Sequence, residues 1–353
     1  MINTQSSFFR RNASGLAVVL ALFLLPFVTG LFEGASPAVV WANEGGISKF
    51  IEGIGIEIFI LALFALSFDL LFGVTGLLSF GHAMFFALPA YLTGILLKNF
   101  HTPILGVVGF VILASFVQAA LFGLVLPRVK GITFTLVTLG LASVFHIIVM
   151  SSDFGKYTGG DVGLQGVVAP PIINPTTERL RFYFVALIIL ILFYLMYKRF
   201  VSSPTGHICV AIRENEGRAK MLGYNTTIFK LIVLFISSLT AAIAGMLHAL
   251  YQPIISPGVA DLGYTIIALL VVLIGGVGTL SGACIGALIY RLLDIGLRRW
   301  IGESAILVTG AVYIAFVLFI PYGIVGTWRL QGRQWKEGIQ NLSRLFRIKP
   351  VQK

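Results

Sequence analysis

The sequence predicts an all-α, polytopic membrane protein with about ten transmembrane helices, some of them interrupted by glycine-rich segments. Of the 353 residues, 58% are hydrophobic and only 11% are charged, whereas a soluble protein of this length keeps a polar shell. Runs of about 18 or more apolar residues recur along the chain, and this is the length of a spanning helix. The short alternating segments typical of a membrane β-barrel are not found in the sequence.

The basic residues predict how these helices are oriented. Spans are expected near residues 15–32, 52–72, 77–97, 103–126, 131–150, 181–198, 228–250, 263–281, 283–300 and 304–321. If the chain starts in the cytoplasm, most of the 25 Lys and Arg residues fall at cytoplasmic span ends, as the positive-inside rule requires. The net charge of +11 therefore indicates topology rather than a nucleic-acid partner, and we expect both termini to be cytoplasmic.

The two ends of the chain differ from the membrane body, which we place at residues 52–325. Residues 1–51 contain a first span and an outer loop. Their basic start and apolar core are also typical of a signal peptide, so both retention and cleavage remain open. Residues 326–353 form a basic tail with interspersed apolar side chains, and a short interfacial helix on an anionic inner leaflet explains that composition.

Two glycine-rich stretches, residues 73–91 and 275–287, interrupt the apolar spans. Non-helical backbone at membrane depth is tolerated where it is buried in protein or lines a water-filled cavity, and in transporters such breaks point to the pathway. The candidate pathway residues are Gly76, Ser79, Gly81, His82, Gly275, Gly276, Gly278, Ser281 and Gly282. Plain packing of small residues between helices is the alternative. For His82, we expect a packed, hydrogen-bonded residue at a helix start rather than a proton relay.

A long outer segment, residues 151–180, combines glycines that allow tight turns with prolines that stiffen the chain. It is either an ordered loop or a docking surface, because functional residues favour loops on a rigid scaffold. The candidate docking residues are Thr158, Gly159, Gly160, Asp161 and Gly163.

A charge-dense segment, residues 206–225, lies between two long apolar runs. Helical spacing predicts one amphipathic helix with its charged residues on the polar face. Its apolar stripe consists of Ile208, Ala211, Ile212, Ala219 and Leu222. Such a helix either offers a handle to a partner protein or lies on the inner leaflet, and Glu214 and Glu216 argue against an anionic surface as the sole partner.

Few charged residues lie within the predicted spans, although each is costly there and is a functional candidate by default. Arg291 and Asp294 lie three residues apart on one helix, which predicts a mutually compensated pair. The sequence has no phosphate-binding GxxxxGK[ST] motif, no nucleophile elbow and no HExxH motif. Its two cysteines give neither metal-ligand spacing nor a disulfide framework. We therefore expect no catalytic residue, no metal and no nucleotide site on this chain.

Four motifs resemble one protein family. The segment "GHICVAIRENEGRAKMLGYN" (206–225) resembles the cytoplasmic loop of LivM-type permeases from branched-chain amino acid ABC importers. The segments "GVTGLLSFGHAMFFALPAYLTGIL" (73–96), "TGGDVGLQGV" (158–167) and "GGVGTLSGACIGA" (275–287) are similar to other motifs of these permeases, in the same order. Leu88-Pro89 and Ala283 depart from the family pattern, which puts the local helix geometry in doubt at those positions.

The resemblance implies a bacterial inner-membrane permease subunit without its own nucleotide site. Its expected partners are a second homologous permease, two cytosolic ATPases that bind ATP and magnesium, and an extracytoplasmic solute-binding protein. Residues 206–225 would be the coupling helix, and its candidate ATPase-coupling residues are Ile212, Arg213, Glu214, Asn215, Glu216, Arg218, Ala219, Leu222 and Gly223. The expected cargo is leucine, isoleucine or valine. Import of urea or short-chain amides, an ion-coupled carrier, and a membrane enzyme or channel are the alternatives.

Overall fold

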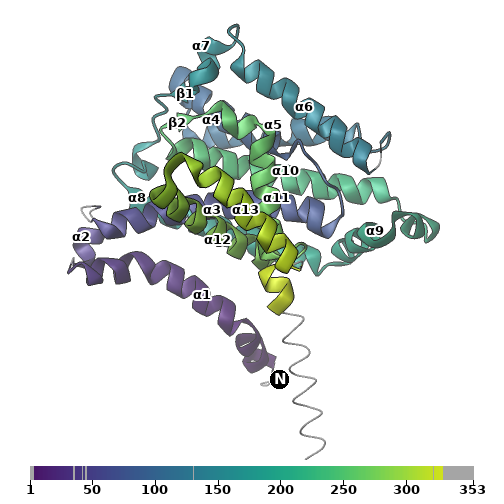
Figure 1. Ribbon diagram of the computed structural model, residues 1–353, viewed down its shortest axis with the longest axis horizontal. Helices are drawn as coiled ribbons and strands as arrows, with labels where there is room; N and C mark the ends of the chain where they lie inside the picture. The colour runs from purple at the N-terminus through teal and green to yellow at the C-terminus, as the bar shows by residue number, and fades with distance from the viewer. Residues whose placement is uncertain are drawn as a thin grey trace, which may run out of the picture.

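The computed structural model describes residues 4–34, 36–41, 43, 46–129, 131–320 and 322–328, so most of the expected basic tail lies outside the described residues. Long helices run side by side through the body, and α1 runs along one edge of it (Figure 1). Helix α9 lies at one end of the body, and the strands β1 and β2 lie towards the opposite end (Figure 1). We call these the α9 end and the strand end.

Helices form nearly all of the described chain. They are α1 (Thr4–Phe32), α2 (Pro37–Trp41), α3 (Ile47–Asp69), η1 (Leu70–Val74, a π-helical turn), α4 (His82–Asn99), α5 (Ile104–Gly123), α6 (Ile132–Met150), α7 (Gly155–Thr158), η2 (Gly160–Val162), η3 (Pro171–Ile173), α8 (Arg179–Val201), α9 (Pro204–Met221), α10 (Thr226–Tyr251), η4 (Pro257–Ala260), α11 (Leu262–Gly275), α12 (Leu280–Ile301), η5 (Gly302–Ser304) and α13 (Ala305–Phe319). The strands β1 (Leu164–Gln165) and β2 (Ile254–Ile255) form one short antiparallel ladder. The predicted all-α class is confirmed.

Helix α3 is the centre of the body. It is apolar on every side between residues 58 and 66, and nearly all of its side chains from Ile56 onwards are buried, as expected for a helix surrounded by other helices. It packs against α8, α10 and α12.

Helices α4 and α10 approach each other at backbone distance. A β-carbon at Gly245 of α10 would overlap the carbonyl oxygen of Phe86 in α4. The neighbouring Ala241, Ala242 and Ala244 are also buried. Small residues are what allows membrane helices to approach this closely.

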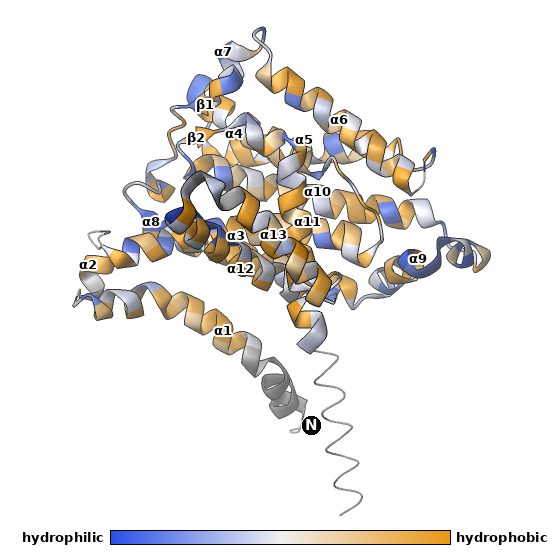
Figure 2. Ribbon diagram, in the orientation of Figure 1, coloured by the Kyte–Doolittle hydropathy of each residue, from blue (hydrophilic) through white to orange (hydrophobic). Residues whose placement is uncertain are grey.

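Within the described residues, seven helices are long and apolar enough to cross a membrane. The other three predicted spans correspond to α4, α11 and α13. At about 1.5 Å per residue, the 14 residues of α11 extend about 21 Å, less than the hydrocarbon thickness of about 30 Å. Helix α11 therefore depends on the irregular segment after it to complete a crossing. Hydropathy separates α9 from these apolar helices, because much of its ribbon is coloured as hydrophilic (Figure 2).

Candidate functional site

The two predicted glycine breaks are real interruptions of the helices. After η1, the chain leaves helical geometry at Gly76, whose φ is +76°, and helix α4 begins only at His82. Helix α11 ends at Gly275, and Gly276 and Gly278 then have φ values of +117° and +73°. Glycine is the residue that adopts these angles without steric cost.

The two breaks meet at the α9 end of α3. The backbone N–H of Gly278 donates to Oδ1 of Asp69 at 2.7 Å. A β-carbon at Gly73 would lie 2.5 Å from the Gly278 nitrogen, so the two backbones are in direct contact. Asp69 is fully buried, and its carboxylate fixes the second break against the helix that leads into the first one.

Arg213 brings helix α9 to the same point. Its Nη1 donates to the carbonyl oxygen of Gly73, and its side chain packs over Gly76, where a β-carbon would lie 2.8 Å from Arg213 Cγ. We name the group of Asp69, Gly73, Gly76, Arg213 and Gly278 the glycine junction. It connects one surface helix to both interrupted membrane segments.

The other glycines predicted for the pathway are close-packed within this chain. A β-carbon at Gly275 would overlap the Gly282 carbonyl oxygen, and one at Gly81 would overlap that of Thr138. A β-carbon at Gly276 would lie 2.9 Å from the carbonyl oxygen of Tyr322. Such close contacts are what plain packing of small residues between helices predicts.

The polar residues of the breaks differ in how deeply they lie. Ser79 is buried and Ser281 is half-buried. His82 is also buried, and its Nε2 lies 2.8 Å from the Ser67 hydroxyl. The rings of Phe64, Phe68 and Phe85 surround the imidazole. His82 therefore lies as a packed, hydrogen-bonded residue at the start of α4.

The predicted single helix over residues 206–225 is wrong at Asn215. This residue has φ −161° and ψ 98°, so α9 is two helical pieces joined by an extended residue. The Asn215 side chain accepts a hydrogen bond from the Arg218 N–H at 2.9 Å, which caps the second piece. A cap inside a charged run has no apolar periodicity to mark it, so the helical spacing did not reveal the break.

The buried side chains of α9 match only part of the predicted apolar stripe. Cys209, Ile212 and Ala219 are buried, whereas Ala211 and Leu222 of the predicted stripe are exposed. Ala211 lies in the first piece and Leu222 follows the last residue of the helix, so the break explains neither exposure, and Ala219 in the second piece is buried as predicted.

Glu216 ties the second piece of α9 to α10. It accepts from Lys230 at 2.7 Å, from Lys220 at 3.1 Å and from the Thr226 hydroxyl at 2.9 Å. Burial acts to raise its pKa, but these hydrogen bonds outweigh burial and lower the pKa from 4.5 to about 2. The carboxylate is therefore charged at neutral pH and holds the two helices together.

The end of α9 presents apolar side chains to the outside. Met221 is 90% exposed and Leu222 is 71% exposed, and Tyr224 follows the turn at Gly223, whose φ is +87°. Glu214 is also exposed and pairs with Arg213 at 2.8 Å. We name Met221, Leu222 and Tyr224 the α9 tip.

The predicted docking residues lie at the strand end. Thr158 donates to the Val149 carbonyl oxygen at 2.8 Å, and a β-carbon at Gly163 would lie 2.5 Å from the carbonyl oxygen of Ile255. Gly159 and Gly160 both have positive φ, and Asp161 is exposed. The loop is thus an ordered structure held against the chain segment that follows α10.

The family model described as branched-chain amino acid transport system / permease component matches residues 50–321. The chain belongs to this family. It is 26% identical to the high-affinity branched-chain amino acid transport system permease protein LivM of Salmonella typhimurium, over 88% of this chain and 79% of that protein. The LivM protein of Escherichia coli is equally similar. The LivH permease protein of Escherichia coli is 25% identical over 75% of this chain and 91% of its own length. No solved structure is significantly similar to the chain.

Membership of this family makes the chain a multi-pass transporter subunit. Asp69 lies within a predicted span, and its partner Gly278 is 209 residues away, so no local sequence pattern connects the two. The cost of a carboxylate at membrane depth was the available signal, because such a group needs a partner. Glu57 is a second carboxylate within a predicted span to which the same argument applies.

Proposed function

We propose that this chain is the permease subunit of an ATP-driven importer for leucine, isoleucine and valine. The observation that carries the proposal is the contact of Arg213 with Gly73, because it links a surface helix to both glycine breaks. The family to which the chain belongs and the printed names of its relatives support the choice of cargo.

The proposed coupling works through contact at the backbone. A cytosolic ATPase subunit binds the α9 tip in an apolar groove, as amphipathic helices bind elsewhere. When the ATPase subunits close, α9 moves, and Arg213 transmits the movement to Gly73 and through Asp69 to Gly278. The exposed Glu214 and Arg218 set the orientation of the ATPase on the helix.

The remaining partners follow from the two ends of the body. A second homologous permease completes the pathway, and the glycine breaks lie at or beside it. ATP and magnesium bind to the ATPase subunits rather than to this chain. A solute-binding protein delivers the amino acid to the loop around Asp161, which places the strand end outside and the α9 end in the cytoplasm of a bacterial inner membrane.

Reconstitution of the complete importer in liposomes tests the coupling. We expect Arg213→Met to keep ATP hydrolysis but lose most leucine uptake, and Glu214→Lys or Arg218→Glu to weaken ATPase binding. Arg128→Met is the matched control, because Arg128 is exposed and its side chain donates to Leu124 of its own helical turn. Normal uptake by Arg213→Met would refute a coupling role for the glycine junction. If the wild-type importer takes up urea and not leucine, the proposed cargo is refuted.

The orientation of the chain in the membrane can be tested in intact cells. A cysteine at Asp161 should react with an impermeant thiol reagent, whereas a cysteine at Glu214 should react only after the membrane is opened. The reverse pattern would overturn the proposed topology.

A further inference from the structure

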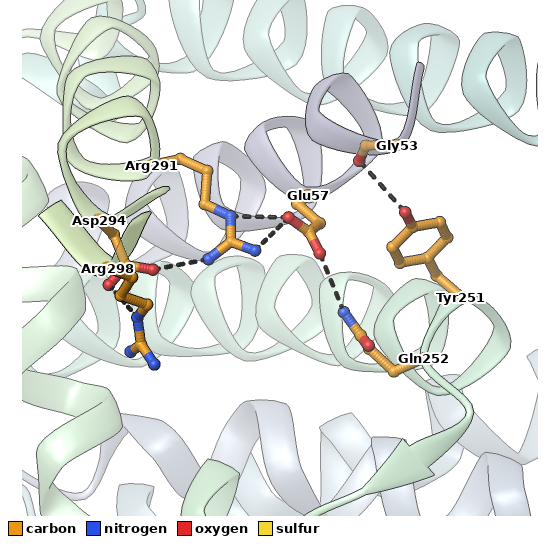
Figure 3. Close-up of polar contacts among 7 residues, drawn as sticks. All are labelled: Gly53, Glu57, Tyr251, Gln252, Arg291, Asp294 and Arg298. Atoms are coloured by element: carbon orange, nitrogen blue, oxygen red, sulfur yellow. Dashed lines mark hydrogen bonds and ion pairs between the residues drawn. The ribbon is translucent and has the colours of Figure 1, made fainter. Parts of the chain in front are cut away.

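Four charged residues and one amide form a connected cluster near the strand end (Figure 3). Nε of Arg291 donates to Glu57 at 2.7 Å, and its Nη1 donates to Asp294 at 2.8 Å. Nε of Arg298 donates to the other oxygen of Asp294 at 2.7 Å. Gln252 donates to the second oxygen of Glu57 at 3.3 Å. We name Glu57, Gln252, Arg291, Asp294 and Arg298 the ion-pair cluster.

The cluster lies within the membrane body. Glu57 is ten residues from the start of α3 at Ile47, which is about 15 Å of helix. Arg291 lies in the middle of α12, a helix of 22 residues. Charged groups at such depth are costly and are candidates for ion or substrate pathways.

The charges in the cluster cancel, because two carboxylates face two guanidinium groups. Glu57 and Arg291 are partly exposed, at 22% and 28% of their side chains, and Arg298 is the most exposed member at 64%. Asp294 is more buried and stays paired with Arg298. Separation of Glu57 from Arg291 would therefore leave Arg291 still compensated by Asp294.

Gln252 connects the cluster to the ordered loop. It directly follows Tyr251, the last residue of α10, and β2 begins two residues later at Ile254. Ile254 pairs with Gln165 of β1, which directly follows the predicted docking residues. A shift of that loop would therefore act on Gln252 and its hydrogen bond to Glu57.

We infer that Glu57 and Arg291 form a gate that recognises the zwitterionic backbone of the amino acid. The inference rests on the proposed function and names the residues that bind the transported amino acid. When the gate opens, the α-carboxylate of the cargo binds Arg291 and its α-ammonium binds Glu57. A zwitterion can replace the ion pair without leaving either charge unpaired, whereas a buried unpaired charge is expensive.

Asp294 and Arg298 are positioning residues in this gate. Asp294 holds the Arg291 guanidinium in place while Glu57 turns to the cargo, and Arg298 holds Asp294. A planar guanidinium binds a carboxylate through two parallel N–H groups, so a fixed Arg291 presents a defined seat for the α-carboxylate.

Replacing both Glu57 and Arg291 by neutral residues tests whether the pair is a gate or a purely structural contact. The double variant Glu57→Gln/Arg291→Gln keeps the cluster neutral, so we expect the complete importer to assemble and to hydrolyse ATP. Leucine uptake from the loaded binding protein should fall about tenfold or more, because loss of even one charge-assisted contact corresponds to about a tenfold change. Wild-type uptake by this variant would overturn the gate.

The matched control is Glu178→Gln/Arg181→Gln, which removes an ion pair near the start of α8 and should leave uptake unchanged. If the double variant fails to assemble, Glu57→Asp decides, because it keeps the charge and shortens the side chain. We then expect normal assembly and a several-fold slower uptake, whereas unchanged uptake would refute the gate. A wild-type importer that does not carry leucine would refute the proposed function itself, and the gate with it.

Discussion

The glycine junction and the ion-pair cluster are built on the same helix in different ways. Asp69 and Glu57 both project from α3, 12 residues or about 18 Å apart. At the glycine junction the charged side chains bind backbone groups, since Asp69 accepts from Gly278 and Arg213 donates to Gly73. In the ion-pair cluster the charged side chains bind one another.

This difference separates a fixed joint from an exchangeable contact. A backbone group that loses its side-chain partner stays buried and unsatisfied, because no other group can reach it. A charged side chain can rotate to a new partner of opposite charge. We therefore expect substitutions at Asp69 and at the close-packed glycines of the two breaks to damage the fold, and substitutions in the ion-pair cluster to spare it.

The largest expected effect is at Gly275, in the second break. Gly275→Ala places a β-carbon on the Gly282 carbonyl oxygen, and overpacking of this kind costs about 1–3 kcal/mol. The matched control is Gly296→Ala in α12, where a β-carbon meets nothing within 4 Å. Thermal unfolding of the purified complex should show a clear loss for the first variant only. Equal stability of the Gly275→Ala and Gly296→Ala variants would contradict the expected difference between the glycine breaks and the ion-pair cluster.

Removal of the Asp69 carboxylate should cost slightly less. Asp69→Leu leaves the Gly278 N–H buried without an acceptor, which costs about 1–3 kcal/mol. Asp69→Asn keeps an oxygen that can accept the same hydrogen bond and should retain part of the stability. The two variants are compared by thermal unfolding, and a more stable Leu variant would show that this bond does not hold the junction.

A smaller effect on stability is expected for the ion-pair cluster. Glu57→Gln or Arg291→Gln alone leaves one unbalanced charge, whereas the double variant leaves none. The double variant should therefore lose less stability than the sum of the two single variants. Thermal unfolding of all four proteins measures this coupling, and simple additivity would contradict an interacting pair.

The smallest effect concerns Glu216 and pH. Its pKa is about 2 in the folded protein instead of 4.5. Its contribution is therefore complete above about pH 4.5 and is lost as the pH falls towards about 2. The difference in thermal stability between the wild type and Glu216→Gln should stay constant from about pH 5 to pH 8 and shrink at about pH 3. A difference that changes near neutral pH would place another titrating group at this contact.

The sequence predicted elements better than contacts between distant elements. Long apolar runs identified the spanning helices, and positive φ angles occur at glycines of both predicted breaks, among them Gly76 and Gly278. Local spacing also predicted the pair of Arg291 and Asp294. Each of these features depends on residues that are close in the chain.

Features that depend on distant residues were not predictable in the same way. Glu57 lies 234 residues before Arg291, and no local pattern connects them. The extended backbone at Asn215 was missed because its cap satisfies a local need that apolar periodicity does not record. Which glycines touch another backbone, such as Gly275 on Gly282, depends on how α11 and α12 pack.

The long separation between Glu57 and Arg291 also has a consequence for biosynthesis. The ribosome adds about 5–20 residues per second, so the 234 residues between them take roughly 10 to 50 s to make. Throughout that interval α3 has already been synthesised, while the cation that completes its ion pair does not yet exist. A nascent or truncated chain that stops before α12 therefore carries the Glu57 carboxylate without its cationic partner, and an unpaired charge at membrane depth is costly.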